Sequence, residues 1–200
     1  VKLECCYSHL SMDELAMKAA TAAVLFFASL VPCTAEAQEG ERVLFNFERP
    51  DAASRWQPVN DGVMGGRSSG RFLINDKKDM EFFGNLSLAN NGGFASVRSR
   101  GTSLNLKQGD TIVVRFRGDG REYSFNLYPA GRRTAFSYRA FFRTEPGQWM
   151  VAKFPLSIFR ATSFGRTLSN QPLNPSQISS VGFLLGDKRP GSFKLEVASI

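Results

Sequence analysis

The sequence predicts an all-β protein, a β-sandwich of the jelly-roll kind. After Gly40, apolar and polar residues alternate with a period of two, which is typical of strands that bury one face. Turn-forming residues separate about ten such segments, and no long segment has the period of an amphipathic helix. A hydrophobic content of 42% with 18 Phe gives the 200-residue chain enough apolar surface for one sizeable core.

The expected strands follow one another at short intervals. They cover residues 42–47, 70–74, 80–88, 94–100, 110–118, 121–129, 136–144, 149–156, 179–186 and 192–200. Asp119 and Gly120 separate the fifth and sixth segments, and this dipeptide is typical of a type I′ turn, so a hairpin is predicted there. Residues 157–176 contain three Pro or Gly breaks and no alternation, so we expect one long loop with a helical turn near 157–160.

The N-terminal region has the layout of a secretory signal peptide over residues 17–37. Lys18 provides the positive charge, residues 19–31 form an apolar stretch shorter than a membrane-spanning helix, and Ala35-Glu36-Ala37 is a small-x-small cleavage site. We then expect Met17 to be the natural start and residues 1–16 to be a mis-assigned extension. The mature domain is expected to span residues 38–200 and to be exported, either to the periplasm or outside the cell.

Removal of this leader leaves a domain without Cys or His. The three cysteines, at positions 5, 6 and 33, and the single histidine, His9, all precede residue 38. Thiol nucleophiles, disulfides, Ser-His triads and Cys/His metal sites are thereby excluded from the mature domain. The carboxylates Asp61, Glu81, Asp119 and Glu122 belong to no recognisable catalytic pair, so we expect neither catalytic residues nor a metal or cofactor.

The mature domain is strongly basic. The full chain carries a net charge of +7, and residues 1–37 hold two Lys and four acidic residues, so residues 38–200 carry +9. A neutral or acidic partner is therefore expected, either an acidic protein surface or an anionic membrane surface. The arginines are scattered, which argues against nucleic acid and is also compatible with an ordinary solvated surface.

A glycine-rich segment, NDGVMGGRSSG, occupies residues 60–70. It does not match a phosphate-binding loop, because the sixth position counted from Gly62 is Arg67 and no helical pattern follows. It also contains no pair of glycines separated by one residue, as a dinucleotide-binding loop requires. We therefore expect consecutive tight turns at Gly62, Gly65 and Gly66 that present Arg67 and Ser68 to a partner.

Four blocks of sequence resemble the complex I intermediate-associated protein 30 family in order and spacing. They are WQPVNDGVMGGRS (56–68), FFGNLSLANNGGFASVRS (82–99), GDGREYSFNL (118–127) and PSQISSVGFLLGDKRPGSFKLEV (175–197). The resemblance implies a galactose-binding-like β-sandwich and a non-catalytic assembly factor, as the mitochondrial members are for NADH:ubiquinone oxidoreductase. The leader would make this chain an exported bacterial member of the family.

Arginines alternate with the apolar residues of several strands. If the strands at 94–100, 110–118, 121–129 and 136–144 share a sheet, one of its faces is basic, which suits recognition of carboxylate, phosphate or sugar hydroxyls. The same pattern fits a face that is merely solvated. The predicted binding surface comprises Asp61, Gly62, Gly65, Gly66, Arg67, Ser68, Arg117, Asn126, Tyr128 and Arg139.

Two functions follow from these observations. The first is a binding or assembly-factor module that acts through contacts with a protein partner, such as a respiratory or envelope complex. The alternative is an exported carbohydrate-binding module whose partner is a glycan, which requires an exposed aromatic residue beside polar side chains at a loop rim.

Overall fold

The structure is a computed structural model that describes residues 40–131 and 135–200. The predicted leader at 17–37, and residues 1–16 ahead of it, lie outside the described residues. None of the helices in the described part of the chain is long and apolar enough to cross a membrane.

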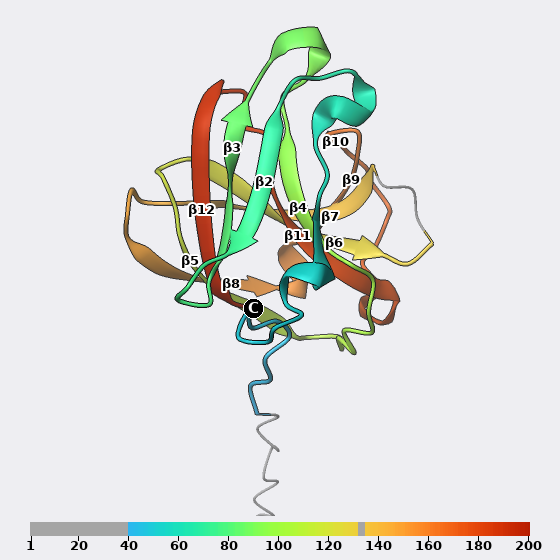
Figure 1. Ribbon diagram of the computed structural model, residues 1–200. Helices are drawn as coiled ribbons and strands as arrows, with labels where there is room; N and C mark the ends of the chain where they lie inside the picture. Colours follow the sequence, from blue (N-terminus) through green and yellow to red (C-terminus); the bar gives the residue numbers. More distant parts are fainter. Residues whose placement is uncertain (1–39, 132–134) are drawn as a thin grey trace, which may run out of the picture. The chain divides into compact units, whose positions relative to one another are not determined.

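Two antiparallel sheets pack face to face in the jelly-roll sandwich that the sequence predicts (Figure 1). The seven-stranded sheet has the order β1-β4-β11-β6-β7-β9-β10, and the five-stranded sheet has the order β2-β3-β12-β5-β8. The strands are β1 Trp56–Pro58, β2 Ser69–Ile74, β3 Met80–Leu86, β4 Ala95–Ser99, β5 Thr111–Arg117, β6 Glu122–Pro129, β7 Phe136–Arg143, β8 Trp149–Pro155, β9 Arg160–Ser163, β10 Arg166–Thr167, β11 Ile178–Leu185 and β12 Gly191–Ser199. Short 3-10 helices lie in the connections, namely η1 Ala53–Arg55, η2 Asp61–Met64, η3 Ala89–Asn91, η4 Leu156–Ile158 and η5 Pro175–Gln177.

Aromatic side chains from both sheets interleave in the core. The ring of Phe116 on β5 lies 4.7 Å from that of Phe142 on β7, measured between centroids. The ring of Phe125 on β6 lies 5.2 Å from that of Phe154 on β8. Each pair joins one sheet to the other, and tilted or edge-on aromatic pairs of this kind add stabilisation to that of the buried area.

The hairpin predicted at Asp119 and Gly120 does not form. Strand β5 pairs with β8 and β12, whereas β6 pairs with β11 and β7, so the chain crosses here from one sheet to the other. Gly120 does adopt the positive φ of a tight turn, at 86°. The carboxylate of Asp119 accepts hydrogen bonds from the Tyr123 hydroxyl and from the backbone N–H of Lys194. These contacts with β6 and β12 direct the turn, and no local dipeptide pattern encodes them.

Two further expectations differ from the structure. Residues 42–47 form no strand; Asn46 makes a single bridge to Ser199, while Phe45 and Phe47 pack against Trp56. The segment 157–176 is not one loop, because β9 and β10 lie within it and extend the seven-stranded sheet beyond β7. Its expected helical turn is present as η4, shifted to Leu156–Ile158.

Candidate binding pocket

The glycine-rich segment forms a single 3-10 turn followed by a left-handed residue. Helix η2 ends at Gly65, whose φ of 86° favours glycine, as the sequence predicts. A Cβ atom at Gly66 would lie 2.3 Å from Cγ of Asp61, so this glycine admits a neighbouring side chain. At Gly62 a Cβ atom would meet nothing within 4 Å. The glycines thus serve the backbone and the packing of Asp61.

Asp61 is fully buried and ties three segments together. Its carboxylate accepts hydrogen bonds from the hydroxyl of Ser68 at 2.6 Å and from the backbone N–H groups of Ser68, Gly93 and Phe94 at 2.9, 2.7 and 3.3 Å. Burial opposes ionisation, but these hydrogen bonds outweigh it and hold the pKa of Asp61 below its ordinary value. These hydrogen bonds form a brace of Asp61 with Ser68, Gly93 and Phe94. The brace fixes η2 against the residues that follow η3, at the top of Figure 1.

Arg67 and Ser68 are neighbours in sequence, but one side chain is exposed and the other is buried. Ser68 is only 8% exposed, and its hydroxyl also accepts from the N–H of Ser87 at 3.0 Å, so it is part of the brace. Arg67 is exposed, and among the described residues no hydrogen bond or ion pair involves it. Of the two side chains that the sequence analysis expects to face a partner, Arg67 is exposed and Ser68 is not.

The outward face of β6 is buried even though it points away from the core. Ser124 and Asn126 are 1% and 0% exposed, and Tyr128 is also buried. The strand register places Asn126 opposite Arg139 on β7 and opposite Gly182 on β11, and places Gly182 opposite Arg98 on β4. One row across four strands therefore carries two arginines separated by a glycine and an amide.

Gly182 is needed for this row. A Cβ atom at Gly182 would lie 2.5 Å from the backbone oxygen of Val97 and 3.1 Å from Cγ of Arg98. Because β11 carries no side chain at this point, Arg98 can extend across it, and its guanidinium carbon lies 4.4 Å from the centroid of the Tyr128 ring. This cation–π contact orients Arg98 toward the centre of the face.

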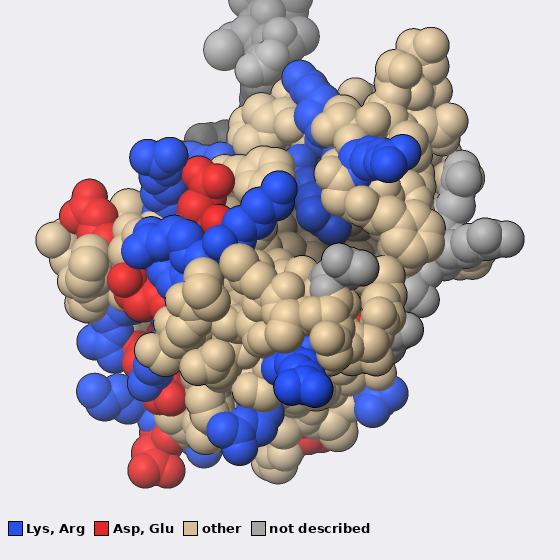
Figure 2. Space-filling view, turned by 90° about the horizontal axis from the view of Figure 1, so that it is seen from above, with Lys and Arg blue, Asp and Glu red and all other residues tan. Residues whose placement is uncertain are grey.

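A pocket of about 500 Å³ opens on this face. Its lining comprises Val59, Met64, Gly92, Gly93, Phe94, Arg98, Tyr128, Ala135, Ser137, Arg139, Phe164, Gly165, Leu184 and Gly186. Figure 2 shows basic side chains within a hollow bordered by uncharged residues, with most of the visible acidic residues toward the left of the view. The pocket thus combines a mainly apolar wall with positive charge.

Arg139 is held in the pocket under unfavourable electrostatic conditions. Burial and the positive charge of Arg98 lower the pKa of Arg139, although Tyr128 partly offsets this effect. Its Nε donates a long hydrogen bond, 3.4 Å, to the hydroxyl of Ser137. Asn126 lies beside it, fully buried, and donates from Nδ2 to the Tyr128 hydroxyl at 3.1 Å.

The expected basic face is divided between the two sheets. Arg98 and Arg139 line the pocket with Tyr128, whereas Arg117 lies on β5 in the five-stranded sheet. There Arg117 pairs with Glu196 and lies over the ring of Trp149, 5.0 Å from its centroid. The structure thus brings Asn126, Tyr128 and Arg139 together and leaves Arg117 apart, because β5 and β6 belong to different sheets.

Two exposed apolar residues of the pocket were not identified from the sequence. Met64 is 52% exposed at the end of η2, and Phe164, which follows β9, is 70% exposed with a φ of 47°. An exposed aromatic residue in a left-handed conformation is unusual, and the Phe164-Gly165 pair within the supposed long loop was its only signal. The two tryptophans are elsewhere: Trp56 is in the core and Trp149 is covered by arginines.

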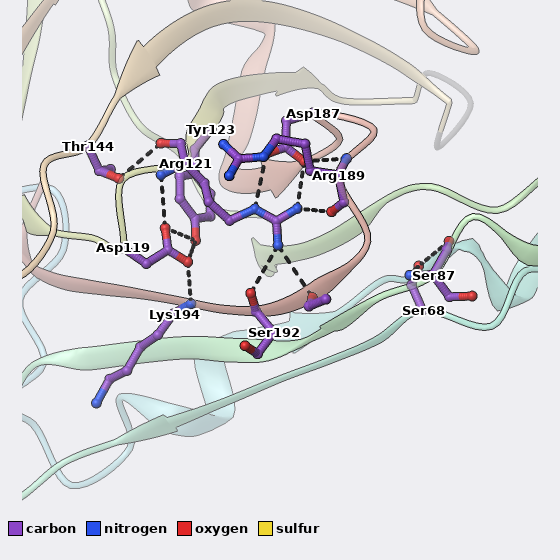
Figure 3. Close-up of polar contacts among 11 residues, drawn as sticks. Ser68, Ser87, Asp119, Arg121, Tyr123, Thr144, Asp187, Arg189, Ser192 and Lys194 are labelled. Atoms are coloured by element: carbon purple, nitrogen blue, oxygen red, sulfur yellow. Dashed lines mark hydrogen bonds and ion pairs between the residues drawn. The ribbon is translucent and has the colours of Figure 1, made fainter.

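A second polar cluster is structural. The buried Arg121 forms an ion pair with Asp187 at 2.7 Å and donates to the backbone oxygens of Arg189 and Ser192 (Figure 3). Burial acts against both charges, yet their pairing raises the pKa of Arg121 and lowers that of Asp187. The cluster joins the start of β6 to the β11–β12 connection. Within the described residues no group of three His, Cys, Asp or Glu side chains could hold a metal ion.

The fold defines the class of protein as a galactose-binding-like jelly roll. The chain resembles the family 11 carbohydrate-binding module of the cellulase Lic26A-Cel5E of Clostridium thermocellum, with a TM-score of 0.59 and 16% identity over 80% of this chain and 95% of that one. A structure of the Clostridium thermocellum family 11 module with a β-1,3-1,4-mixed-linked tetrasaccharide gives a TM-score of 0.56 and 17% identity, over 78% of this chain and 94% of that one. At such identities the likeness shows the fold alone.

Sequence relationships define the family. A sequence model of the complex I intermediate-associated protein 30 family matches residues 45–197, and the chain belongs to this family. The mitochondrial complex I intermediate-associated protein 30 of Mus musculus is 31% identical over 80% of this chain, and that of Drosophila melanogaster is 28% identical over 78%. The matched region spans 55% and 60% of the length of these relatives.

The blocks that carry the family resemblance surround the pocket. The first contributes Val59 and Met64, the second contributes the segment from Gly92 to Phe94 together with Arg98, and the fourth contributes Leu184 and Gly186. The third ends beside Tyr128 and includes Asn126, which bonds to it. The pocket is therefore built largely from the segments that identify the family.

Proposed function

We propose that this protein is a non-catalytic binding module that engages a partner protein through the pocket on the outer face of the seven-stranded sheet. The observation that carries the proposal is the combination of exposed Met64 and Phe164 with half-buried Arg98 and Arg139 in one hollow. Exposed apolar side chains beside arginine are typical of the centre of a protein interface, where aromatic residues, Met and Arg are enriched.

Family membership supports the same reading. The relatives in Mus musculus and Drosophila melanogaster are named as mitochondrial proteins associated with an intermediate of complex I. For the present chain we propose an assembly-factor role at a respiratory or envelope complex. An anionic membrane surface near that complex would attract the basic domain.

A non-catalytic role agrees with the chemistry of the pocket. Its described lining contains no carboxylate, His or Cys, and the neighbouring Asp61 is fully buried with its oxygens engaged by four hydrogen bonds. A nucleophile with an adjacent general base is therefore lacking among the lining residues. Carbohydrate-binding modules, which share the fold, are likewise a non-catalytic kind of domain.

Glycan binding is the second candidate, and Phe164 is the observation that favours it. An aromatic ring at a loop rim, beside Arg139 and Ser137, meets the requirement for a sugar-stacking platform. The tryptophans do not meet this requirement, because Trp56 is in the core and Trp149 is covered by arginines.

Partner capture by pocket variants tests the proposal. A Met64→Ser/Phe164→Ser variant should lose the proteins that co-purify with the wild-type chain from native envelope membranes, as measured by quantitative mass spectrometry. Phe141→Ser is the matched control, because Phe141 is 65% exposed on β7 but does not line the pocket. Equal capture by all three proteins would contradict the proposal. Retention of an insoluble polysaccharide by wild type and control, with loss in the pocket variant, would instead support the glycan.

The location of the protein is a separate proposal. We propose that the chain is exported and that the mature protein begins near Gln38, on the basis of the signal-like segment 17–37. Mass spectrometry of the N-terminal peptide of the native protein provides the test. An N-terminal peptide from within residues 17–37, recovered from a cytoplasmic fraction, would exclude export.

A further inference from the structure

The polar side chains of the pocket are suited to an anion. Those that line it are Arg98, Arg139, Tyr128 and Ser137, and none is a carboxylate or an amide. The two arginines are donors only, with no capacity to accept a hydrogen bond. A neutral sugar, whose hydroxyl groups need acceptors as well as donors, finds few acceptors here.

The hydroxyl of Tyr128 strengthens this bias. Its oxygen accepts the hydrogen bond from Nδ2 of Asn126, and no hydrogen bond donated by its proton is found among the described residues. The fully buried Asn126 therefore leaves the Tyr128 hydroxyl as a donor. A group bound beside Arg98 and Tyr128 would thus meet two guanidinium groups and one O–H, all of them donors.

The charge of Arg139 is not balanced by the described residues that line the pocket. Arg139 is half-buried, and none of these described lining residues is acidic. Asp61, whose carboxylate binds the N–H of the lining residue Gly93, is fully buried and already engaged. A half-buried charge such as that of Arg139 is costly without a counter-charge, and a bound anion would reduce that cost.

We infer that the pocket binds a carboxylate of a partner polypeptide, with Arg139 and Arg98 contacting the carboxylate and Met64 and Phe164 covering the apolar residues beside it. The inference rests on the proposed function, since it takes the partner to be a protein, and it adds the chemistry of recognition. A planar guanidinium matches a carboxylate through paired hydrogen bonds. The apolar wall formed by Phe94 and Leu184 favours a polypeptide over free phosphate, which has no apolar part to place there.

Matched peptides test the inference. They also distinguish a C-terminal carboxylate from the side-chain carboxylate of an acidic residue. Three hexapeptides share an apolar Leu/Phe sequence: the first has a free C-terminal carboxylate and no acidic side chain, the second is amidated with a central Glu, and the third is amidated with Gln in place of Glu. Titrations of the full chain, followed by calorimetry and by NMR shifts of pocket residues, should give at least one carboxylate peptide a dissociation constant about tenfold or more below that of the Gln peptide.

Two arginine variants on one strand provide the control. Arg139→Gln should abolish the preference for the carboxylate peptide, whereas Arg143→Gln should retain it. Both arginines lie on β7, and Arg143 pairs with Glu122 at the surface without lining the pocket. A melting temperature of Arg139→Gln at or above that of the wild type would show that the variant is folded.

Several results would overturn the inference. Equal affinity for all three peptides, with loss of all three in Phe164→Ser, would leave protein binding in place and exclude the carboxylate. Absence of binding by all three peptides at millimolar concentration would also overturn it. A preference of the pocket for inorganic phosphate would assign the arginines to a different anion. Binding of galacto-oligosaccharides alone would exclude both the carboxylate and the protein partner.

Discussion

At the scale of single residues, the buried charge of Asp61 and the half-buried charge of Arg139 have opposite effects on the stability of the fold. Asp61 is ionised and accepts four hydrogen bonds, so its charge stabilises the fold. Arg139 has one long hydrogen bond, and both its burial and Arg98 lower its pKa, so its charge is held at a cost. Buried polar groups are normally satisfied, so the weakly satisfied charge of Arg139 is the observation on which the proposed carboxylate ligand rests.

The contact between Gly66 and Asp61 predicts a loss of stability on adding one methyl group. Gly66→Ala should lower the free energy of unfolding by about 1–3 kcal/mol, because the new Cβ atom would displace the Asp61 carboxylate from its donors. Gly62→Ala is the control, since a Cβ atom there meets nothing within 4 Å and φ is not positive. Urea unfolding measures both, and equal stability of the two variants would contradict the packing argument.

Asp61 should also affect how the free energy of unfolding falls at acidic pH. Because its pKa is lower in the folded than in the unfolded protein, its contribution is complete above about pH 4 and is lost as the pH falls through the folded value. Asp61→Asn should cost about 1–3 kcal/mol at pH 7, since its amide presents donors to N–H groups. The difference between wild type and variant should shrink from pH 5 to pH 2 in chemical unfolding. A difference independent of pH would show that its charge does not matter.

At the scale of elements, connections between sheets decide the topology, and buried polar groups hold these connections. Arg121, just before β6, reaches Asp187 and the backbone oxygen of Ser192 near the start of β12. The third and fourth family-like blocks meet in this cluster. Arg121 belongs to the third block, and its partner Asp187, 66 positions later, belongs to the fourth. The cluster thus stabilises the positions of two loops and contributes no residue to the pocket lining.

Removal of Arg121 should therefore be severe. Arg121→Met should lower the free energy of unfolding by about 3–5 kcal/mol, because it leaves a buried Asp187 without its counter-charge. Adding Asp187→Leu should recover part of this loss, since the uncompensated charge is then removed. Thermal and urea unfolding of the three proteins measure the effect. No recovery in the double variant would show that the backbone contacts of Arg121 dominate.

At the scale of the whole molecule, the buried core formed by the described residues lies within the unit Glu41–Ile200. Its first member is Phe45, whose N–H donates to the backbone oxygen of Ile200 at 3.0 Å and whose ring lies 5.2 Å from that of Trp56. The beginning and the end of the unit thus meet beside the same core aromatic.

Truncation tests that boundary. A chain beginning at Gln38 should melt within about 2 °C of the 200-residue protein, because it keeps every described core residue. A chain beginning at Asn46 should be about 3–5 kcal/mol less stable, since it lacks Phe45, which is 2% exposed. Differential scanning calorimetry compares the three chains. A large loss on truncation to Gln38 would place part of the fold in the N-terminal segment.

The sequence by itself determined the fold class, most of the strands and the family. Period-two alternation reports which face of each strand is buried, and this depends on local sequence. For this reason the strand predicted at 70–74 agrees with the structure. The positive φ of Gly65 also agrees, because the preference of glycine for this conformation is local as well. The same local information indicated that Asn126 and Arg139 face away from the core.

Tertiary structure decided which strands pair and which polar residues meet. Alternation is the same whichever neighbour a strand takes, so the crossing between β5 and β6 could not be read from Asp119 and Gly120. That crossing moved Arg117 to the opposite sheet. Contacts across tens of residues likewise decided that Ser68 is a buried brace and that Phe164 stands at the pocket rim. Burial and pairing are properties of neighbours in space, which a sequence pattern does not contain.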